Sequence, residues 1–229
     1  MKVNYQKLLD EVINALSQES PQKKPSLLLH ACCGPCSSYV LEYLAGFFQI
    51  TVFYYNPNIY PPEEYQRRLE ELKNLYKRFP PALENSVRIV EAPYIPEDFF
   101  TAIKVREEPE LAREAEKGER CRRCYALRLE NSFSYALENH FDYFCTTLSI
   151  SPFKDAEKIN IIGENLVKEF CSSHPESETF PKWLYSDFKK RGGFKRSLEL
   201  SAEYNLYRQQ YCGCVYSLQN TQPHEPSST

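Results

Sequence analysis

The chain has 229 residues, a net charge of −3, 42% hydrophobic residues and 26% charged residues, a composition that excludes wholesale disorder. No apolar run approaches the ~18–20 residues of a membrane span, and the first residues contain no apolar core followed by a small-residue cleavage site. We therefore expect a cytoplasmic protein without membrane contact. Any binding of nucleic acid would have to come from a local basic patch, because the net charge is negative.

The cysteine content is unusual for such a protein. The chain has 9 cysteines, an odd number, beside only 7 glycines. A cytosolic protein of this size does not need disulfides to fold, and clustered cysteines in that compartment more often bind metal or do redox chemistry.

The first half of the chain predicts one helix and then alternating strands and helices. Apolar residues recur on one helical face over 3–16, and the polar, proline-flanked stretch that follows indicates a linker. In chain order the patterns then predict a strand over 26–31, a helix over 37–45, a strand over 50–55, a helix over 62–79 and a strand over 87–90.

The second half continues with helical pieces and one more strand. In chain order we expect helices over 97–105, 110–117 and 125–139, a strand over 142–147, a helix over 155–170, an irregular stretch through 181–183, and a last helix over 196–204. These elements divide the chain into an N-terminal helix and linker (1–25), a single α/β domain (26–218) and a disordered tail (219–229).

Alternation of strands and helices predicts right-handed βαβ units, and hence a Rossmann-like parallel sheet with helices on both faces and a mainly helical C-terminal segment. Ligands of such sheets bind at the carboxyl ends of the strands. The segment Cys32–Cys36 follows the first strand and should lie at that edge. It contains neither a G-x-G-x-x-G pattern nor a Walker A lysine.

Two C-x-x-C spacings give the strongest chemical signal. Cys33 and Cys36 have this spacing, Cys121 and Cys124 have it too, and Cys32 adjoins the first pair. Four thiolates suit either zinc or an iron–sulfur cluster. We favour the cluster because most of a domain separates the pairs, whereas structural zinc usually joins two nearby turns of a small module. Zinc, and thiol redox chemistry combined with packing, are the alternatives.

Two further features are ambiguous. Cys212 and Cys214 are close enough in sequence to form a strained, easily reduced disulfide, but they could also be metal ligands or buried thiols. A basic cluster could grip a phosphate backbone, or it could be a solvated loop. Its cations are Lys189, Lys190, Arg191, Lys195 and Arg196.

Five motifs, in order, resemble one known family. They are HACCGPC at 30–36, YNPNI at 55–59, RCRRCY at 120–125, TTLSISPFKD at 146–155 and YRQQYCGC at 207–214. Together they are similar to the epoxyqueuosine reductases of the QueH type, the cobalamin-independent enzymes, over about 27–217.

The resemblance implies the last step of queuosine synthesis, a two-electron reduction of an epoxide at the wobble position of tRNA, with a [4Fe-4S] cluster. Its partners would be tRNA carrying epoxyqueuosine and an unidentified electron donor. By position, the cluster ligands would be Cys32, Cys33, Cys121 and Cys124, and the redox-active pair, linked as a disulfide when oxidised, would be Cys212 and Cys214. Cys36 would either complete the cluster in place of Cys32 or hold an additional iron beside it.

The reaction also needs a proton donor, and we expect it to be Asp155 in the segment after the fourth strand. The alternative from another class is a zinc-stabilised RNA-binding module without catalysis. A third alternative is an ATP-using thiolase on the same sheet, and the missing phosphate loop counts against it.

Overall fold

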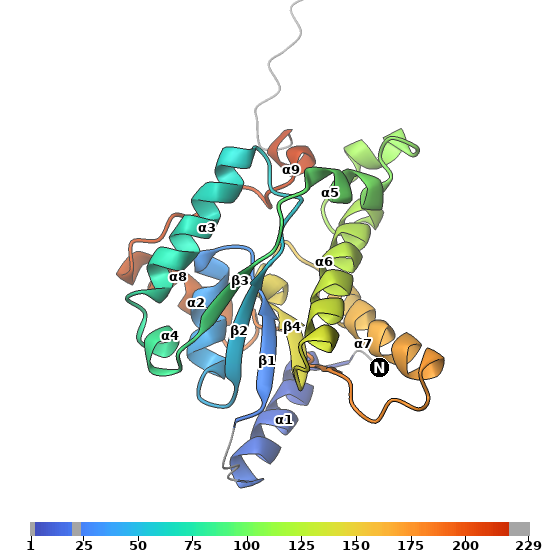
Figure 1. Cartoon of the computed structure of the whole chain (residues 1–229). Coiled ribbons are helices and arrows are strands. Elements are labelled where there is room, and N and C mark those ends of the chain that lie inside the picture. Colours follow the sequence, from blue (N-terminus) through green and yellow to red (C-terminus); the bar gives the residue numbers. More distant parts are fainter. Residues whose placement is uncertain (1–2, 20–23, 220–229) are drawn as a thin grey trace, which may run out of the picture.

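The computed structural model describes residues 3–19 and 24–219, and these form a five-stranded parallel sheet in the order β3-β2-β1-β4-β5 (Figure 1). The predicted Rossmann-like fold is confirmed. The strands are β1 (Ser26–His30), β2 (Gln49–Tyr54), β3 (Arg88–Glu91), β4 (Tyr143–Thr146) and β5 (Lys182–Trp183).

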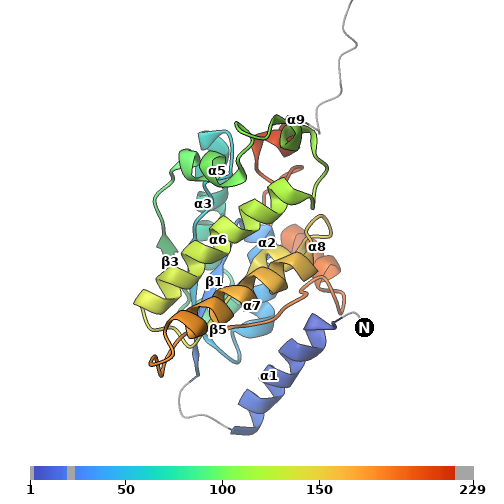
Figure 2. The ribbon, with the colours of Figure 1, turned by 90° about the vertical axis from the view of Figure 1, so that its right-hand side faces the viewer.

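Helices cover both faces of this sheet. On one face α2 packs against α3, α4 and α8, and on the other α6 packs against α7, β1 and β4 (Figure 1; Figure 2). The helices are α1 (Tyr5–Glu19), α2 (Gly34–Leu44), α3 (Pro62–Tyr76), α4 (Pro80–Glu84), α5 (Pro96–Ile103), α6 (Glu119–Glu138), α7 (Ala156–Ser173), α8 (Gly193–Glu203) and α9 (Val215–Gln219), with 3₁₀ turns η1 (Pro109–Arg113) and η2 (Thr147–Ile150).

The core lies between the sheet and these helices. Leu27, Leu28 and Leu29 of β1 are fully buried, as a central parallel strand requires. Helix α1 joins the same core through Leu9 and Ile13, so the N-terminal helix packs on the α/β domain. The predicted tail lies outside the described residues from 220 onward.

Several predicted boundaries are wrong, and one difference matters for the site. Helix α6 begins at Glu119, six residues before the predicted start, because the carboxylate of Glu114 accepts from the backbone N–H groups of Glu119 (2.6 Å) and Arg120 (2.8 Å). The second C-x-x-C pair therefore lies in the first turns of a helix and not in a loop before it.

The other differences concern short elements. The predicted helix over 110–117 is only the short turn η1, and residues 80–84 form a separate helix, α4. The stretch through 181–183 contains β5, whose two residues are too few to show a strand pattern. Helix α8 begins at Gly193, directly after Gly192 in the left-handed region (φ 74°), so Lys195 and Arg196 are helical.

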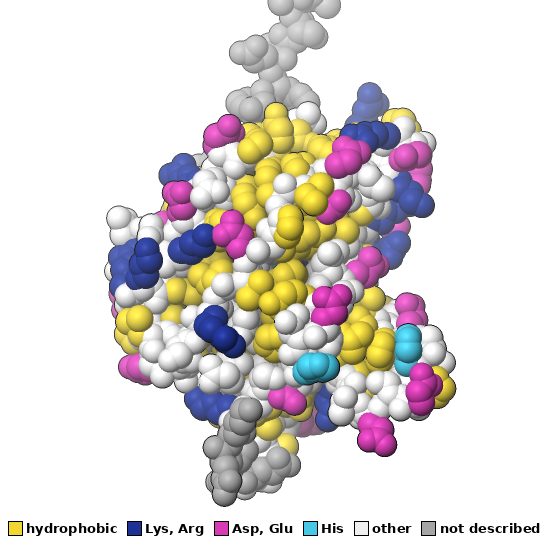
Figure 3. Space-filling view, viewed as in Figure 1, with side chains coloured by type: hydrophobic (Ala, Val, Ile, Leu, Met, Phe, Trp, Pro, Cys, Tyr) yellow, Lys and Arg dark blue, Asp and Glu magenta, His cyan; other side chains and the backbone are white. Residues whose placement is uncertain are grey.

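The space-filling view shows hydrophobic side chains gathered at the centre of one face, with basic and acidic side chains scattered around them (Figure 3). Within the described residues, no helix is long and apolar enough to cross a membrane.

Gly163 in α7 allows the helix to approach Trp183 of β5. A Cβ at this position would lie 2.2 Å from the indole ring, which is too short for a real contact. We predict that Gly163→Ala destabilises the protein by about 1–3 kcal/mol through overpacking, despite the better helix propensity of alanine. Urea unfolding checks this. Gly46→Ala is the matched control, because no atom lies within 4 Å of its added Cβ, and equal effects of the two substitutions would contradict the prediction.

Candidate active site

Three cysteine thiols meet where β1 ends and α2 begins. Cys32 and Cys33 follow the strand directly, and Cys36 lies in the first turn of the helix. The Sγ atoms of the three all lie within 4.8 Å of one another, and those of Cys32 and Cys33 are 3.8 Å apart. Among residues 3–19 and 24–219 this is the only group of three such ligand atoms. Thiolate sulfurs so arranged suit an iron–sulfur cluster or zinc.

Within this group the surroundings favour a thiolate at Cys32, whereas the pKa values of Cys33 and Cys36 are raised. Hydrogen bonds with Cys33 and Cys36, and then the positive charge of Arg128, hold the pKa of Cys32 well below its usual range. The hydrogen bond with Cys32 raises the pKa of Cys33 to about 12. Gln209 Nε2 donates to Cys33 Sγ over 3.0 Å. Because the thiolate is the form that binds metal, the site is prepared for a first metal–sulfur bond.

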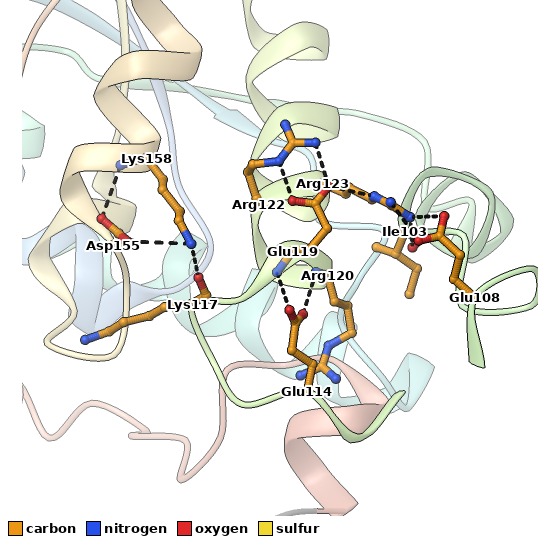
Figure 4. A network of polar contacts seen from close by, with 10 residues as sticks. All are labelled: Ile103, Glu108, Glu114, Lys117, Glu119, Arg120, Arg122, Arg123, Asp155 and Lys158. Atoms are coloured by element: carbon orange, nitrogen blue, oxygen red, sulfur yellow. Dashed lines mark hydrogen bonds and ion pairs between the residues drawn. The ribbon is translucent and has the colours of Figure 1, made fainter. Parts of the chain in front are cut away.

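Cys121 and Cys124 are buried on the inner side of α6, while the arginines between them point outward. Arg122 Nε pairs with Glu119 over 2.7 Å, and Arg123 Nη1 pairs with Glu108 over 2.9 Å (Figure 4). The two thiols are not within the three-cysteine group. Cys124 instead shares an apolar cluster with Cys214. The structure thus brings Cys36 to Cys32 and Cys33, and leaves the helical pair facing the C-terminal cysteines.

A buried network of hydrogen bonds lies between these cysteine groups. Arg128 Nη2 donates to Asn56 Oδ1 over 2.6 Å, and Arg128 Nε lies 3.3 Å from His30 Nε2. His30 Nδ1 lies 2.8 Å from Thr146 Oγ1. Burial, and then Arg128, lower the pKa of His30 to about 3, so this histidine is neutral. His30 is thus a buried hydrogen-bonding partner of the site.

The C-terminal cysteines are held against the site by backbone contacts. Arg68 Nη1 donates to the carbonyl oxygen of Cys212 (3.2 Å), and Tyr60 N donates to that of Gly213 (2.8 Å). Gly213 has φ 122°, which a residue with a side chain rarely adopts. All nine cysteines are free thiols, so the expected disulfide is not present.

Lys154 is a site residue that the sequence did not single out. Its Nζ lies 2.7 Å from Cys212 Sγ and its side chain is buried. Burial alone would lower the pKa of Lys154, but the charge of Cys212 raises it. The pKa of Cys212 is lowered, first by a hydrogen bond from Cys214 and then by Lys154. The only available signal was the position of Lys154 within the SPFKD motif.

A cavity of about 400 Å³ opens beside these groups, within the range of small-molecule sites. Cys32, Cys36 and Cys212 all line it, so both cysteine groups border one space. Apolar side chains form much of the rest, and Phe153 at its edge is 65% exposed. This is an enclosure in which a small ring system could meet the sulfur groups.

Asp155 lies outside that cavity. Its carboxylate accepts from the backbone N–H groups of Glu157 (3.1 Å) and Lys158 (3.2 Å) as the N-cap of α7. It lines a neighbouring polar hollow, which shares Lys154 with the first cavity. Its role as proton donor stays a prediction.

Most cations of the basic cluster already have acidic partners. Arg196 makes a two-pronged bond to Glu42 (2.7 and 2.9 Å), Arg191 pairs with Asp10, and Lys189 pairs with Asp187 (2.9 Å). Lys195 is 83% exposed and 4.0 Å from Glu199. Within the described part of the chain, Lys190 alone of the five forms no ion pair. Lys189, Lys190 and Arg191 line the polar hollow with Asp155.

Comparison with known proteins identifies the family. The family described as epoxyqueuosine reductase QueH matches residues 27–220. The chain belongs to this family. The QueH of Streptococcus pyogenes is 40% identical over 216 residues, covering 94% of this chain and 78% of that protein. The QueH of Thermotoga maritima is 31% identical over 199 residues, covering 84% and 90%. The resemblance inferred from the five motifs is thereby confirmed.

One solved structure also aligns with the chain. The U34-tRNA thiolase NcsA from Methanococcus maripaludis, solved with its [4Fe-4S] cluster, gives a TM-score of 0.47 at 12% identity and covers 92% of this chain and 67% of that one. This similarity is too low to support an inference about the QueH site.

The contact between Lys154 and Cys212 makes a testable prediction. Because the ammonium stabilises the thiolate, Lys154→Met should raise the pKa of Cys212 and slow its alkylation by iodoacetamide, by up to about tenfold for each unit by which the pKa exceeds the pH of the assay. Mass spectrometry of Cys212 across a pH series measures this. Lys158→Met, which removes a cation bonded to the carbonyl of Lys117, is the control. An unchanged pH profile in Lys154→Met would show that the contact does not set the thiolate.

Proposed function

We propose that this chain reduces epoxyqueuosine in tRNA to queuosine. Opening and deoxygenating the epoxide consumes two electrons and two protons, forms a carbon–carbon double bond and releases the oxygen as water. The observation that carries this proposal is the QueH family match across the whole α/β domain, and the three-cysteine group at the strand ends supports it.

The cofactor that fits the donor set is a [4Fe-4S] cluster held by the four ligands Cys32, Cys33, Cys121 and Cys124. All four are buried, and buried cations beside them could balance a negatively charged group. Cys36, close to Cys32 and on the cavity wall, would hold an additional iron. When bound, the cluster would supply low-potential single electrons and an iron able to polarise oxygen.

The chain itself would bind and shield the substrate. Apolar side chains of the cavity, among them Leu148 and Phe194, exclude water from the ring that loses its oxygen. Phe153, exposed at the edge, offers a face on which a neighbouring base could stack. Asp155, in the adjoining hollow, is the proposed source of a proton.

Cys212 and Cys214 would supply the cluster with the two electrons that each reduction consumes. Oxidation of the two thiols to a disulfide releases two electrons and two protons, which balances one reduction of the epoxide. An external electron donor would then reduce the disulfide. Two observations support this role: Cys212 contacts Lys154, which favours its thiolate, and Gly213 has the backbone conformation that a glycine tolerates.

The zinc-stabilised RNA-binding module is not favoured, since members of the matched family are named as reductases.

The basic cluster would bind the tRNA. Its five cations, which would contact the phosphates, are Lys189, Lys190, Arg191, Lys195 and Arg196. Those with acidic partners would exchange them for phosphates on binding.

Cysteine substitutions test the cofactor and the reaction together. We predict that Cys33→Ser and Cys124→Ser each lose iron, acid-labile sulfide and the reduction of epoxyqueuosine in tRNA, because each would remove a cluster ligand. Protein purified without oxygen is assayed for metal, sulfide and nucleoside product. Cys171→Ser in α7 should keep all three, since this thiol lies outside the site. A full complement of iron and sulfide in Cys124→Ser would refute the assignment of the helical pair.

The basic cluster makes a separate prediction about tRNA. Replacing Lys190 and Arg191 by Ala should weaken binding and flatten the dependence of log affinity on log salt by roughly 1.4–1.8, the value for two phosphate contacts. Filter binding at several salt concentrations measures the slope. Lys168→Ala with Lys182→Ala removes two exposed cations from α7 and β5 as a control for net charge. If both double variants change the slope equally, the cluster has no special role.

A further inference from the structure

Arg128 is a buried cation without an acidic partner. Its side chain projects from α6 and the residue is 1% exposed. It bonds to the neutral side chains of Asn56 and His30. Nowhere in residues 3–19 and 24–219 does a carboxylate form an ion pair with it.

A second buried arginine near the cysteines does have an acidic partner. Arg68 is fully buried, and its Nε pairs with Glu64 over 2.7 Å. An unpaired buried charge costs several kcal/mol, so a fold keeps one only where something balances it. The ionisable groups that face Arg128 are His30, which is neutral, and the thiols of Cys124, Cys32 and Cys212.

The guanidinium is fixed in place by the ends of three strands. His30 ends β1 and reaches Thr146 at the end of β4. Asn56 follows β2, and its Nδ2 donates to the carbonyl oxygen of Ala31 over 2.9 Å. Arg128 is therefore held between the two cysteine groups by rigid elements, and it also lines the cavity that they border.

We propose that Arg128 is the countercharge of the iron–sulfur cluster and raises its reduction potential. The inference rests on the cofactor assigned in the proposed function. Cysteinate ligands give the bound cluster a negative charge, and one-electron reduction makes it more negative. A fixed cation between the ligand groups stabilises the reduced form more than the oxidised form. Arg128 would therefore not need to touch the substrate; its charge would act on the reaction through the reduction potential of the cluster.

The test is a redox titration of the cluster, followed by electron paramagnetic resonance with dithionite as reductant and without tRNA. Arg128→Gln removes the charge and should shift the midpoint potential to a more negative value. Arg128→Lys keeps the charge and should stay closer to the wild-type potential. A folded Arg128→Gln chain that binds no iron, beside a loaded Arg128→Lys chain, would equally support the inference.

Asn56→Asp gives a second test that keeps the guanidinium in place. It puts a carboxylate where Oδ1 now accepts from Arg128, so it should also lower the potential. This variant decides the matter if Arg128→Gln does not fold. An unchanged midpoint potential in loaded Arg128→Gln or loaded Asn56→Asp would overturn this inference and leave the proposed function standing. Wild-type protein that binds no iron and sulfide would overturn the inference together with the proposed function.

Discussion

Burial of positive charge at the carboxyl edge of the sheet is the constraint on which this site depends. Arg68, Arg120, Arg128 and Lys154 are all at most 6% exposed, and among them only Arg68 pairs with a carboxylate within the described residues. The Arg120 guanidinium donates to the carbonyl oxygens of Leu111 and Ala112 and lies 5.1 Å from the centre of the Tyr216 ring. Such charges are costly in a protein interior unless anions face them. Here cysteine thiols, together with Glu116 near Lys154, can supply the negative charge.

The same constraint explains why the C-terminal segment lies over the site. Residues far apart in sequence are joined there: Tyr207 N donates to Glu71, Gln209 reaches Cys33, and Arg68 holds the carbonyl oxygen of Cys212. These contacts cover the cations and the cysteines with backbone and amide groups. They also bring Cys212 and Cys32 to the wall of one cavity, as the proposed redox relay would require.

The sequence was sufficient for the first four strands of the sheet and for the cysteine motifs, because both depend on local patterns. The apolar run of β1 and the C-x-x-C spacings are visible without any tertiary contact. The early start of α6 was not visible, because it depends on the carboxylate of Glu114 as a cap and the first turn is otherwise highly charged. Lys154 and Arg128 were missed for a related reason: a cation in a sequence is read as solvated, and only long-range packing shows that these two are buried.

The most direct test of the proposed reaction is a loading series on the wild-type chain. Metal-free protein is reconstituted without oxygen to increasing iron and sulfide content, and each sample is given dithionite and epoxyqueuosine-containing tRNA. We predict that queuosine formed in a fixed time rises in proportion to cluster occupancy and that zinc-loaded protein forms none. Equal product from metal-free or zinc-loaded protein would contradict the account.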